Sequence, residues 1–208
     1  MADVERHEFF PTCIYRFKHD FKENELNDVV KHIEDNSLSE QNGQVIKRTG
    51  SQTQNELHKI DTFANLTKTI IDATKSILNE QGYIGEVEIT NMWGNILRPQ
   101  SQRAHAPHTH SNNFLSGVFY LKTSDDTSPI QFFDPRPQSD VLKPRKKEYN
   151  RLNSNIAQFQ SETGWGVVFP SWLQHWVPET KDERMSIAWN IIVRGEYGEP
   201  NALQNAHI

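Results

Sequence analysis

The stretch that decides the fold is MSIAWNIIV, residues 185–193, near the end of the chain. Its first half alternates large apolar residues with small or polar ones, and a period of two predicts a strand with one face in a core. Arg184 directly precedes this stretch and falls on the polar side together with Ser186. A buried guanidinium needs an anionic partner, so the strand is predicted to carry a binding residue as well as core.

Further segments with strand character occupy residues 86–97, 114–121, 129–134 and 166–169. Short strands separated by turn signals are typical of a β-sandwich or barrel. The predicted fold class is therefore mainly β with flanking helices, a double-stranded β-helix (jelly-roll, cupin-like) of roughly eight strands.

The remainder is predicted to support this core. Residues 9–17 favour a strand, and residues 24–35 have the spacing of a one-sided helix. A second helix is expected from Asp61 or Thr62 to Gly82, with the glycine ending it. Residues 36–56 are polar and predict a long loop, and residues 135–160 predict an insertion over one mouth of the barrel.

Composition limits the class of protein. A chain of 208 residues predicts a single domain, with an N-terminal strand and supporting helices (1–85), a jelly-roll core with the metal site (86–194) and a C-terminal tail (195–208). The net charge of −5 argues against a nucleic-acid partner. No apolar run reaches the ~20 residues of a membrane span, no signal peptide is recognisable, and Cys13 is the only cysteine. A cytoplasmic protein is expected, with a homodimer as one arrangement.

Three histidines suggest a metal site. His108 and His110 are two residues apart, so on a strand both side chains face the same side. His175 follows 65 residues after His110, behind a glycine-rich turn and an apolar strand. Neutral imidazole suits iron, zinc, copper and nickel alike. The competing interpretation is a surface loop that is merely rich in histidine.

Five motifs together resemble a known family. They are HTH (108–110), LSGVFYL (115–121), FDPR (133–136), FPSWLQH (169–175) and ERMSIAWN (183–190). This combination resembles iron(II)/2-oxoglutarate-dependent oxygenases that are found in bacteria and marine phages and are distantly similar to prolyl 4-hydroxylases. The resemblance implies Fe(II), 2-oxoglutarate and O2, and a host-cytoplasmic location if the gene is a phage's. It also implies that His175 is the far iron ligand, that Arg184 and Ser186 hold the distal carboxylate of 2-oxoglutarate, and that Tyr120 contacts the cosubstrate.

One position departs from the usual pattern of that superfamily. Most members bind iron with two histidines and one carboxylate, whereas here His110 stands where the acid is expected. Three interpretations remain open: a site of His108, His110 and His175; a carboxylate supplied by Asp134; or a water or chloride in the gap. Asp134 is equally well explained as a turn residue before Pro135.

The predicted activity is hydroxylation of an unactivated C–H bond, with release of succinate and carbon dioxide. The substrate is expected to be a small molecule or a peptide, with Arg136 and Trp176 as candidate contacts. One alternative is a cupin-type metal protein, because Gly164, Pro170 and His175 have cupin spacing; a cupin would not require Arg184. Another is a jelly-roll that binds ligands without turnover.

Overall fold

The computed structural model describes residues 2–37, 39–41, 44–46, 51–99 and 104–208. The helices are α1 (Glu23–Asn36) and α2 (Ala64–Gln81), with short 3-10 turns η1 (Leu57–Lys59), η2 (Asp61–Phe63) and η4 (Pro137–Asp140). The strands are β1 (Tyr15–Lys18), β2 (Ser39–Gln41), β3 (Gln44–Ile46), β4 (Ser51–Gln52), β5 (Glu86–Leu97), β6 (His105–His108), β7 (Leu115–Lys122), β8 (Ile130–Phe133), β9 (Ile156–Phe159), β10 (Trp165–Pro170), β11 (His175–Val177), β12 (Arg184–Arg194), β13 (Glu196–Tyr197) and β14 (Ala206–His207).

Two antiparallel sheets build the core. The major sheet has the order β1-β10-β7-β12-β5-β4, and the minor sheet has the order β6-β11-β8-β9. Neighbours in both sheets are far apart in sequence: β12 pairs with β5 on one side and with β7 on the other. The two sheets face each other and form a double-stranded β-helix, as the sequence predicted.

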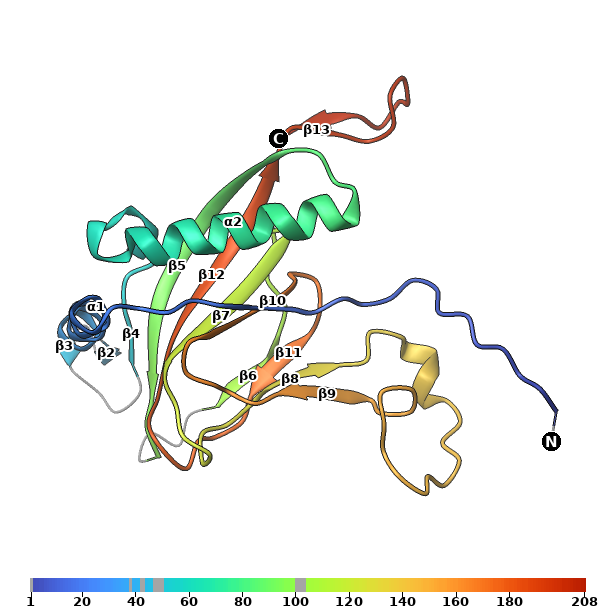
Figure 1. The fold of residues 1–208 in the computed structure, drawn as a ribbon, viewed down its shortest axis with the longest axis horizontal. Helices are drawn as coiled ribbons and strands as arrows, with labels where there is room; N and C mark the ends of the chain where they lie inside the picture. The colour runs from blue at the N-terminus through green and yellow to red at the C-terminus, as the bar shows by residue number, and fades with distance from the viewer. Residues whose placement is uncertain (1, 38, 42–43, 47–50, 100–103) are drawn as a thin grey trace.

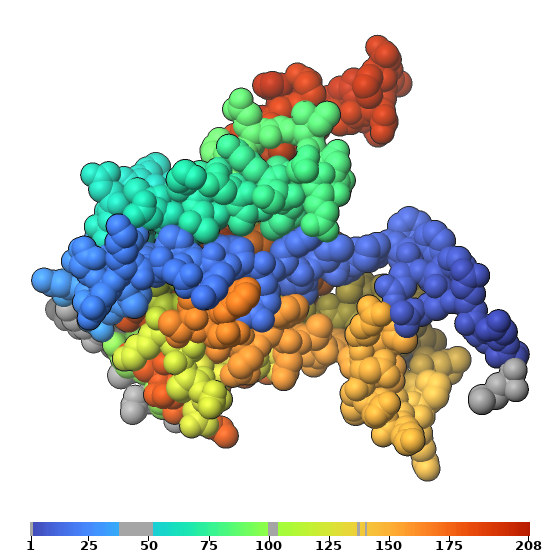
Figure 2. All heavy atoms as spheres, in the orientation of Figure 1, coloured from blue at the N-terminus to red at the C-terminus, as the bar shows by residue number. Residues whose placement is uncertain are grey.

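The two helices cover the outer face of the major sheet (Figure 1). α2 crosses over β5, β12 and β7, and Figure 2 shows α2 and the N-terminal segment lying over this side of the molecule. Buried apolar residues of both helices pack with those of β5, β7 and β12 into one cluster. A second cluster fills the space between the two sheets. The molecule is thus layered as helices, major sheet and minor sheet.

β12 shows how the alternation seen in the sequence is used. Ile187 and Trp189 belong to the cluster under the helices. Arg184, Ser186 and Ala188 face the opposite side and line a cavity between the sheets. One strand therefore seals the core with one face and supplies polar groups to an internal cavity with the other.

Both predicted helices are confirmed, but several boundaries were wrong. Of the predicted strand 9–17 only residues 15–17 pair with a neighbour, the strand continues to Lys18, and Phe9 and Phe10 are exposed. Asp61 and Thr62 form a 3-10 turn, and α2 begins at Ala64. Gly82 does end α2, with a positive φ of 75°.

Two segments predicted as loop or insertion also contribute strands. Residues 36–56 contain a β2–β3 hairpin and the short edge strand β4, although residues 38, 42–43 and 47–50 lie outside the described part. The segment 135–160 ends in β9, which completes the minor sheet. These four strands were missed because each has only two to four residues, too few to show an apolar period. None of the described helices has the length and apolar character that a membrane crossing requires.

Candidate metal centre

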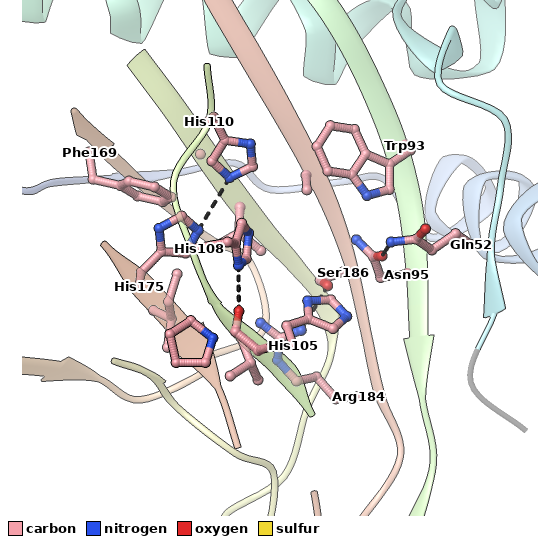
Figure 3. A pocket seen from close by; sticks show the side chains of 17 residues that line it. Gln52, Trp93, Asn95, His105, His108, His110, Phe169, His175, Arg184 and Ser186 are labelled. Carbon is pink, nitrogen blue, oxygen red and sulfur yellow. Dashed lines mark hydrogen bonds between the residues drawn. The ribbon is translucent and has the colours of Figure 1, made fainter. Parts of the chain in front are cut away.

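A cavity of about 360 Å³ lies between the sheets (Figure 3). It receives residues from β4, β5, β6, β7, β8, β10, β11 and β12. Its polar lining consists of Gln52, Asn95, Ser186, Arg184 and four histidines, His105, His108, His110 and His175. No described residue that lines it is acidic, so the wall carries no negative side chain of its own.

Three of these histidines converge on one point. One ring nitrogen from each of His108, His110 and His175 lies within 4.8 Å of the others. His108 and His175 are direct partners across the β6–β11 pair, and the Nε2 atoms of His110 and His175 are 3.2 Å apart. The structure therefore brings together three side chains that span 67 residues of sequence.

Backbone carbonyls set the tautomers of two of the rings. Nδ1 of His108 lies 2.7 Å from the carbonyl oxygen of Ala106, and Nδ1 of His175 lies 2.9 Å from that of Leu173. A carbonyl oxygen can only accept, so each Nδ1 carries the proton and donates it. Nε2 of both rings is left with its lone pair available in the cluster, which is the usual arrangement of a metal-binding histidine.

Two of the three rings resist protonation. Burial, with a smaller contribution from His108, lowers the pKa of His110 to about 4. Burial also lowers the pKa of His175 to about 4, although the hydrogen bond to Leu173 opposes this effect. Both imidazoles are neutral at pH 7 and can bind a cation through a lone pair. This donor set fits a divalent first-row metal such as Fe(II).

His110 reaches the cluster by a route that the strand argument did not predict. β6 ends at His108, and His110 lies two residues beyond the strand. Its backbone N–H donates to the carbonyl oxygen of Ser171 over 2.9 Å. The i, i+2 alternation of a strand is therefore the wrong reason for the convergence of His108 and His110, although the two rings do meet.

Arg184 is the buried cation of the cavity. Only 1% of this residue is exposed. Its Nη1 donates to the Ser186 hydroxyl over 3.0 Å, and its guanidinium lies 4.8 Å from the centre of the Tyr120 ring. Within the described part of the chain, no carboxylate pairs with it and its Nε has no hydrogen-bond acceptor. A buried unpaired cation is costly, so this arrangement calls for an anion from outside the chain.

Tyr120 adds a second buried polar atom without a partner. Its side chain is fully buried, and its hydroxyl makes no hydrogen bond among the described residues. Burial raises the pKa of Tyr120, so the phenol keeps its proton and can act as a donor. Tyr120 and Ser186 are opposite each other in the β7–β12 pair, which places all three predicted cosubstrate contacts together.

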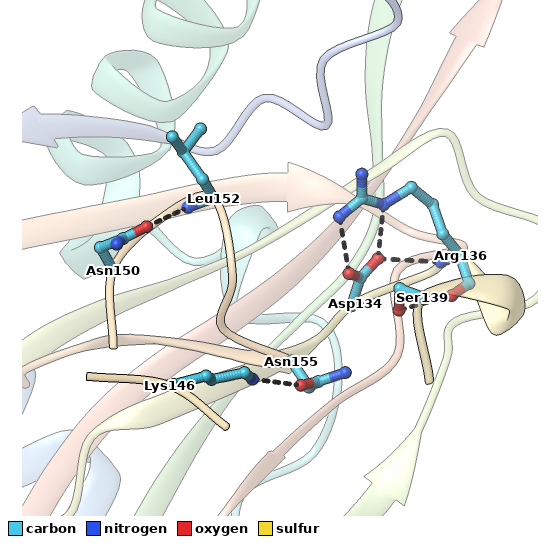
Figure 4. Close-up of polar contacts among 7 residues, drawn as sticks. All are labelled: Asp134, Arg136, Ser139, Lys146, Asn150, Leu152 and Asn155. Atoms are coloured by element: carbon cyan, nitrogen blue, oxygen red, sulfur yellow. Dashed lines mark hydrogen bonds and ion pairs between the residues drawn. The ribbon is translucent and has the colours of Figure 1, made fainter. Parts of the chain in front are cut away.

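Three predicted residues lie outside the cavity. Asp134 accepts two hydrogen bonds from the Arg136 side chain, at 2.9 and 2.8 Å, beside a separate small cavity of about 150 Å³ (Figure 4). These bonds lower the pKa of Asp134 to about 2 and occupy both of its oxygens. Trp176 donates to Gln131 over 2.8 Å and does not line the cavity. These positions do not support Asp134 as a metal ligand. They also do not support Arg136 and Trp176 as substrate contacts.

Three polar residues that line the cavity were not predicted from the sequence. His105 begins β6 beside Arg184 and Ser186, and burial lowers its pKa to about 4. Gln52 donates to Asn95 over 2.9 Å on the opposite wall. Asn95 is two residues from Trp93, which also lines the cavity, so alternation along β5 was a usable signal. Gln52 gave no signal, because it lies in a two-residue edge strand.

Comparisons with known proteins agree with this geometry. Residues 91–190 match a protein-family model described as "Putative 2OG-Fe(II) oxygenase". No curated protein matches the chain. Similar solved structures include a Pseudomonas putida prolyl-4-hydroxylase, at 13% identity, TM-score 0.58, and coverage of 88% of this chain and 94% of that one.

Two further similar structures contain bound ligands. A Trichoplax adhaerens prolyl hydroxylase in complex with a hypoxia inducible factor peptide fragment is 10% identical, covers 86% of this chain and 83% of its own, and has a TM-score of 0.57. HygX from Streptomyces hygroscopicus, with nickel, 2-oxoglutarate and hygromycin B bound, is 10% identical, covers 88% and 83%, and has a TM-score of 0.57. At these identities the likeness establishes a shared fold.

Proposed function

We propose that this chain, which carries a 2OG-Fe(II) oxygenase domain over residues 91–190, hydroxylates a C–H bond of a small-molecule or peptide substrate. The overall reaction consumes 2-oxoglutarate and O2. One oxygen atom of O2 enters succinate and the other enters the product as a hydroxyl group, while the 1-carboxylate leaves as carbon dioxide. The observation that carries this proposal is a single cavity that holds three converging imidazoles and a buried guanidinium that has no anionic partner among the described residues.

His108, His110 and His175 would hold the iron through their unprotonated nitrogens. When bound, Fe(II) supplies the oxidising chemistry that this class of reaction needs. The two carbonyls that accept from His108 and His175 keep those rings in the metal-binding tautomer. The pKa values near 4 of His110 and His175 keep protons from competing with the metal at neutral pH.

Arg184 and Ser186 would hold the distal carboxylate of 2-oxoglutarate. A guanidinium can give a carboxylate two parallel hydrogen bonds, and Nε of Arg184 is a free donor among the described residues. The Tyr120 ring packs against the guanidinium, and its unpartnered hydroxyl is a further donor for the same carboxylate. Because these groups are buried, the carboxylate would be shielded from water, and each charge-assisted bond would be strong.

The nature of the substrate follows from what remains of the wall. Arg184 is the only arginine, lysine or carboxylate side chain among the described lining residues, and burial lowers the pKa of His105 to about 4. With Arg184 engaged by the cosubstrate, the free wall consists of His105, Trp93, the Gln52–Asn95 amide pair and apolar side chains. We therefore expect the substrate to present an uncharged group to the metal, whether it is a peptide or a small molecule.

An anaerobic titration of the full-length chain tests this function. Fe(II) plus 2-oxoglutarate should produce a visible charge-transfer band. Arg184→Ala should abolish this band or raise the 2-oxoglutarate concentration that it requires by at least about tenfold, because the variant loses a charge-assisted hydrogen bond to the cosubstrate. Arg136→Ala is the matched control, because Arg136 is an exposed arginine outside the cavity and should leave the band unchanged. A wild type without any band would favour the cupin-type alternative.

Turnover needs a separate measurement. Wild type with iron, ascorbate and 2-oxoglutarate should release succinate, faster with the true substrate. If the band forms but no succinate appears with any substrate tried, the protein is a binding jelly-roll and the proposed hydroxylation is wrong.

A further inference from the structure

His110 differs from the other two histidines in how it is held. His108 and His175 lie on paired strands, and carbonyl oxygens orient their rings. His110 lies beyond β6, and the hydrogen bond that ties its backbone to the barrel runs to the carbonyl oxygen of Ser171. The position of the third imidazole therefore depends on how firmly Ser171 is held.

Ser171 is the end of a row of buried hydrogen bonds. Its hydroxyl lies 2.8 Å from that of Ser116, which in turn donates to Oδ1 of Asn190 over 2.7 Å. A hydroxyl has one proton, so Ser116 accepts from Ser171 and donates to Asn190. Nδ2 of Asn190 then donates to Oδ1 of Asn91 over 2.7 Å. We call Ser171, Ser116, Asn190 and Asn91 the buried polar chain.

The buried polar chain crosses the major sheet from β5 through β12 and β7 to the segment between β10 and β11. Ser171, Ser116 and Asn190 are 0%, 1% and 4% exposed. Burying polar side chains contributes little net stability even when all are bonded, and costs free energy when one bond is missing. A continuous row of such bonds across the sheet is explained better by a positional requirement than by stability.

We propose that the buried polar chain is a positioning device for His110: it fixes the Ser171 carbonyl that receives the His110 N–H and thereby holds the third imidazole at the metal. This role rests on the proposed function, because it exists only if His110 binds the metal. Residues that orient metal ligands commonly affect metal affinity by about 10–100-fold without touching the metal. Ser116, in the middle of the row, is the residue at which a substitution interrupts it.

A double-mutant cycle tests the role, with cobalt(II) as the probe and the metal dissociation constant of the full-length protein as the readout. Ser116→Ala should weaken cobalt binding by about tenfold in the wild type. In a His110→Ala background the same substitution should change the dissociation constant by less than about twofold, because the ligand through which it acts is gone. A merely structural role would weaken binding equally in both backgrounds and would overturn the proposal.

Ser161→Ala is the matched control. The Ser161 hydroxyl is also buried, and lies 2.7 Å from the Thr127 hydroxyl, away from the buried polar chain. It should leave cobalt affinity unchanged in both backgrounds; a loss equal to that of Ser116→Ala would count against the proposal. If Ser116→Ala fails to fold, Ser171→Ala removes the terminal hydroxyl alone and should give the same pattern.

The outcomes separate the two proposals. A wild type that binds neither cobalt nor the iron–2-oxoglutarate pair would overturn the proposed function and, with it, the positioning role. A wild type that binds both, with Ser116→Ala as tight as wild type, would overturn the positioning role alone. If His110→Ala bound cobalt as tightly as wild type, His110 would not be a ligand, and the positioning role would fall while the oxygenase activity stood.

Discussion

His110 is the residue that sets this centre apart. Non-haem iron oxygenases of this class commonly present two histidines and one carboxylate to the metal. Replacing the carboxylate by a neutral imidazole leaves the metal centre with one more positive charge. Among the described residues, no acid lines the cavity to compensate. A dianionic cosubstrate would bring one negative charge to Arg184 and one to Fe(II) held by three imidazoles, so one excess positive charge would stay at the metal.

The role of Asp134 can be decided by one substitution. We predict that Asp134→Asn leaves the cobalt or iron dissociation constant within about twofold of wild type, because both carboxylate oxygens are engaged by Arg136 outside the cavity. Metal titration followed by absorbance measures this. His175→Ala is the positive control and should lose measurable binding; an equal loss in Asp134→Asn would make Asp134 a ligand.

Arg184 is expected to lower the stability of the unliganded protein and to provide binding affinity for 2-oxoglutarate. Without an anion, its buried guanidinium is uncompensated among the described residues, so Arg184→Met should raise the free energy of unfolding of the unliganded protein by about 1 kcal/mol or more. Cosubstrate at 100 times its dissociation constant should stabilise metal-loaded wild type by about 2.7 kcal/mol and leave the variant unchanged. Urea unfolding with and without 2-oxoglutarate measures both effects. Equal stabilisation of the two proteins would contradict the assigned role.

At the scale of elements, β7 and β12 carry the site because each has two different faces. Their outer faces pack under the helices, and their inner faces supply Tyr120, Arg184 and Ser186. Gly117 of β7 is opposite Trp189 of β12, and the indole ring leaves no room for a side chain at position 117. A Cβ at Gly117 would lie 2.2 Å from the indole ring.

Gly117→Ala should therefore destabilise the protein by about 2–3 kcal/mol, the upper range for overpacking a core. In a Trp189→Phe background the same substitution should cost clearly less, because the outer ring of the indole that it would strike is absent. Equilibrium urea unfolding of the four proteins gives the coupling. Purely additive effects would show that contact with Trp189 is not the cause.

At the scale of the whole molecule, the cluster links metal binding to acid stability. Burial of His105, His110 and His175 lowers each pKa from the ordinary 6.5 to about 4. The unfolded chain therefore takes up protons first as the pH falls. The stability contributed by the neutral rings is complete above about pH 6.5 and is lost as the pH falls toward 4.

We predict that the metal-free protein loses free energy of unfolding steadily between pH 7 and pH 5, and that His110→Asn loses less over the same interval. Urea unfolding at pH 7, 6 and 5 with a chelator present measures this. Added metal should raise stability most at pH 7, where protons compete least for the rings. A wild-type stability that is flat from pH 7 to pH 5 would contradict the assigned environment of the rings.

Much of this fold was predictable because long buried strands and one-sided helices leave a period in the sequence. The period of two over residues 185–193 and the 3–4 spacing of α1 predicted the elements, and motif spacing predicted the His108, His110 and His175 set and Arg184. Edge strands such as β4 and β9 left no such trace, and the residues they supply, including Gln52, were missed.

The sequence by itself determined which side of each long strand is apolar, which residues can bind a metal or an anion, and in what order they come. Only the tertiary structure decided that His110 meets His108 from beyond the strand, that Asp134 is turned to Arg136, and that a buried row of hydrogen bonds ends at Ser171. The physical reason is that periodicity reports burial along one element, whereas the imidazole cluster and the buried row join segments far apart in sequence that only strand pairing brings together. Asp134 and Arg136 lie two residues apart in a loop, which has no period to read.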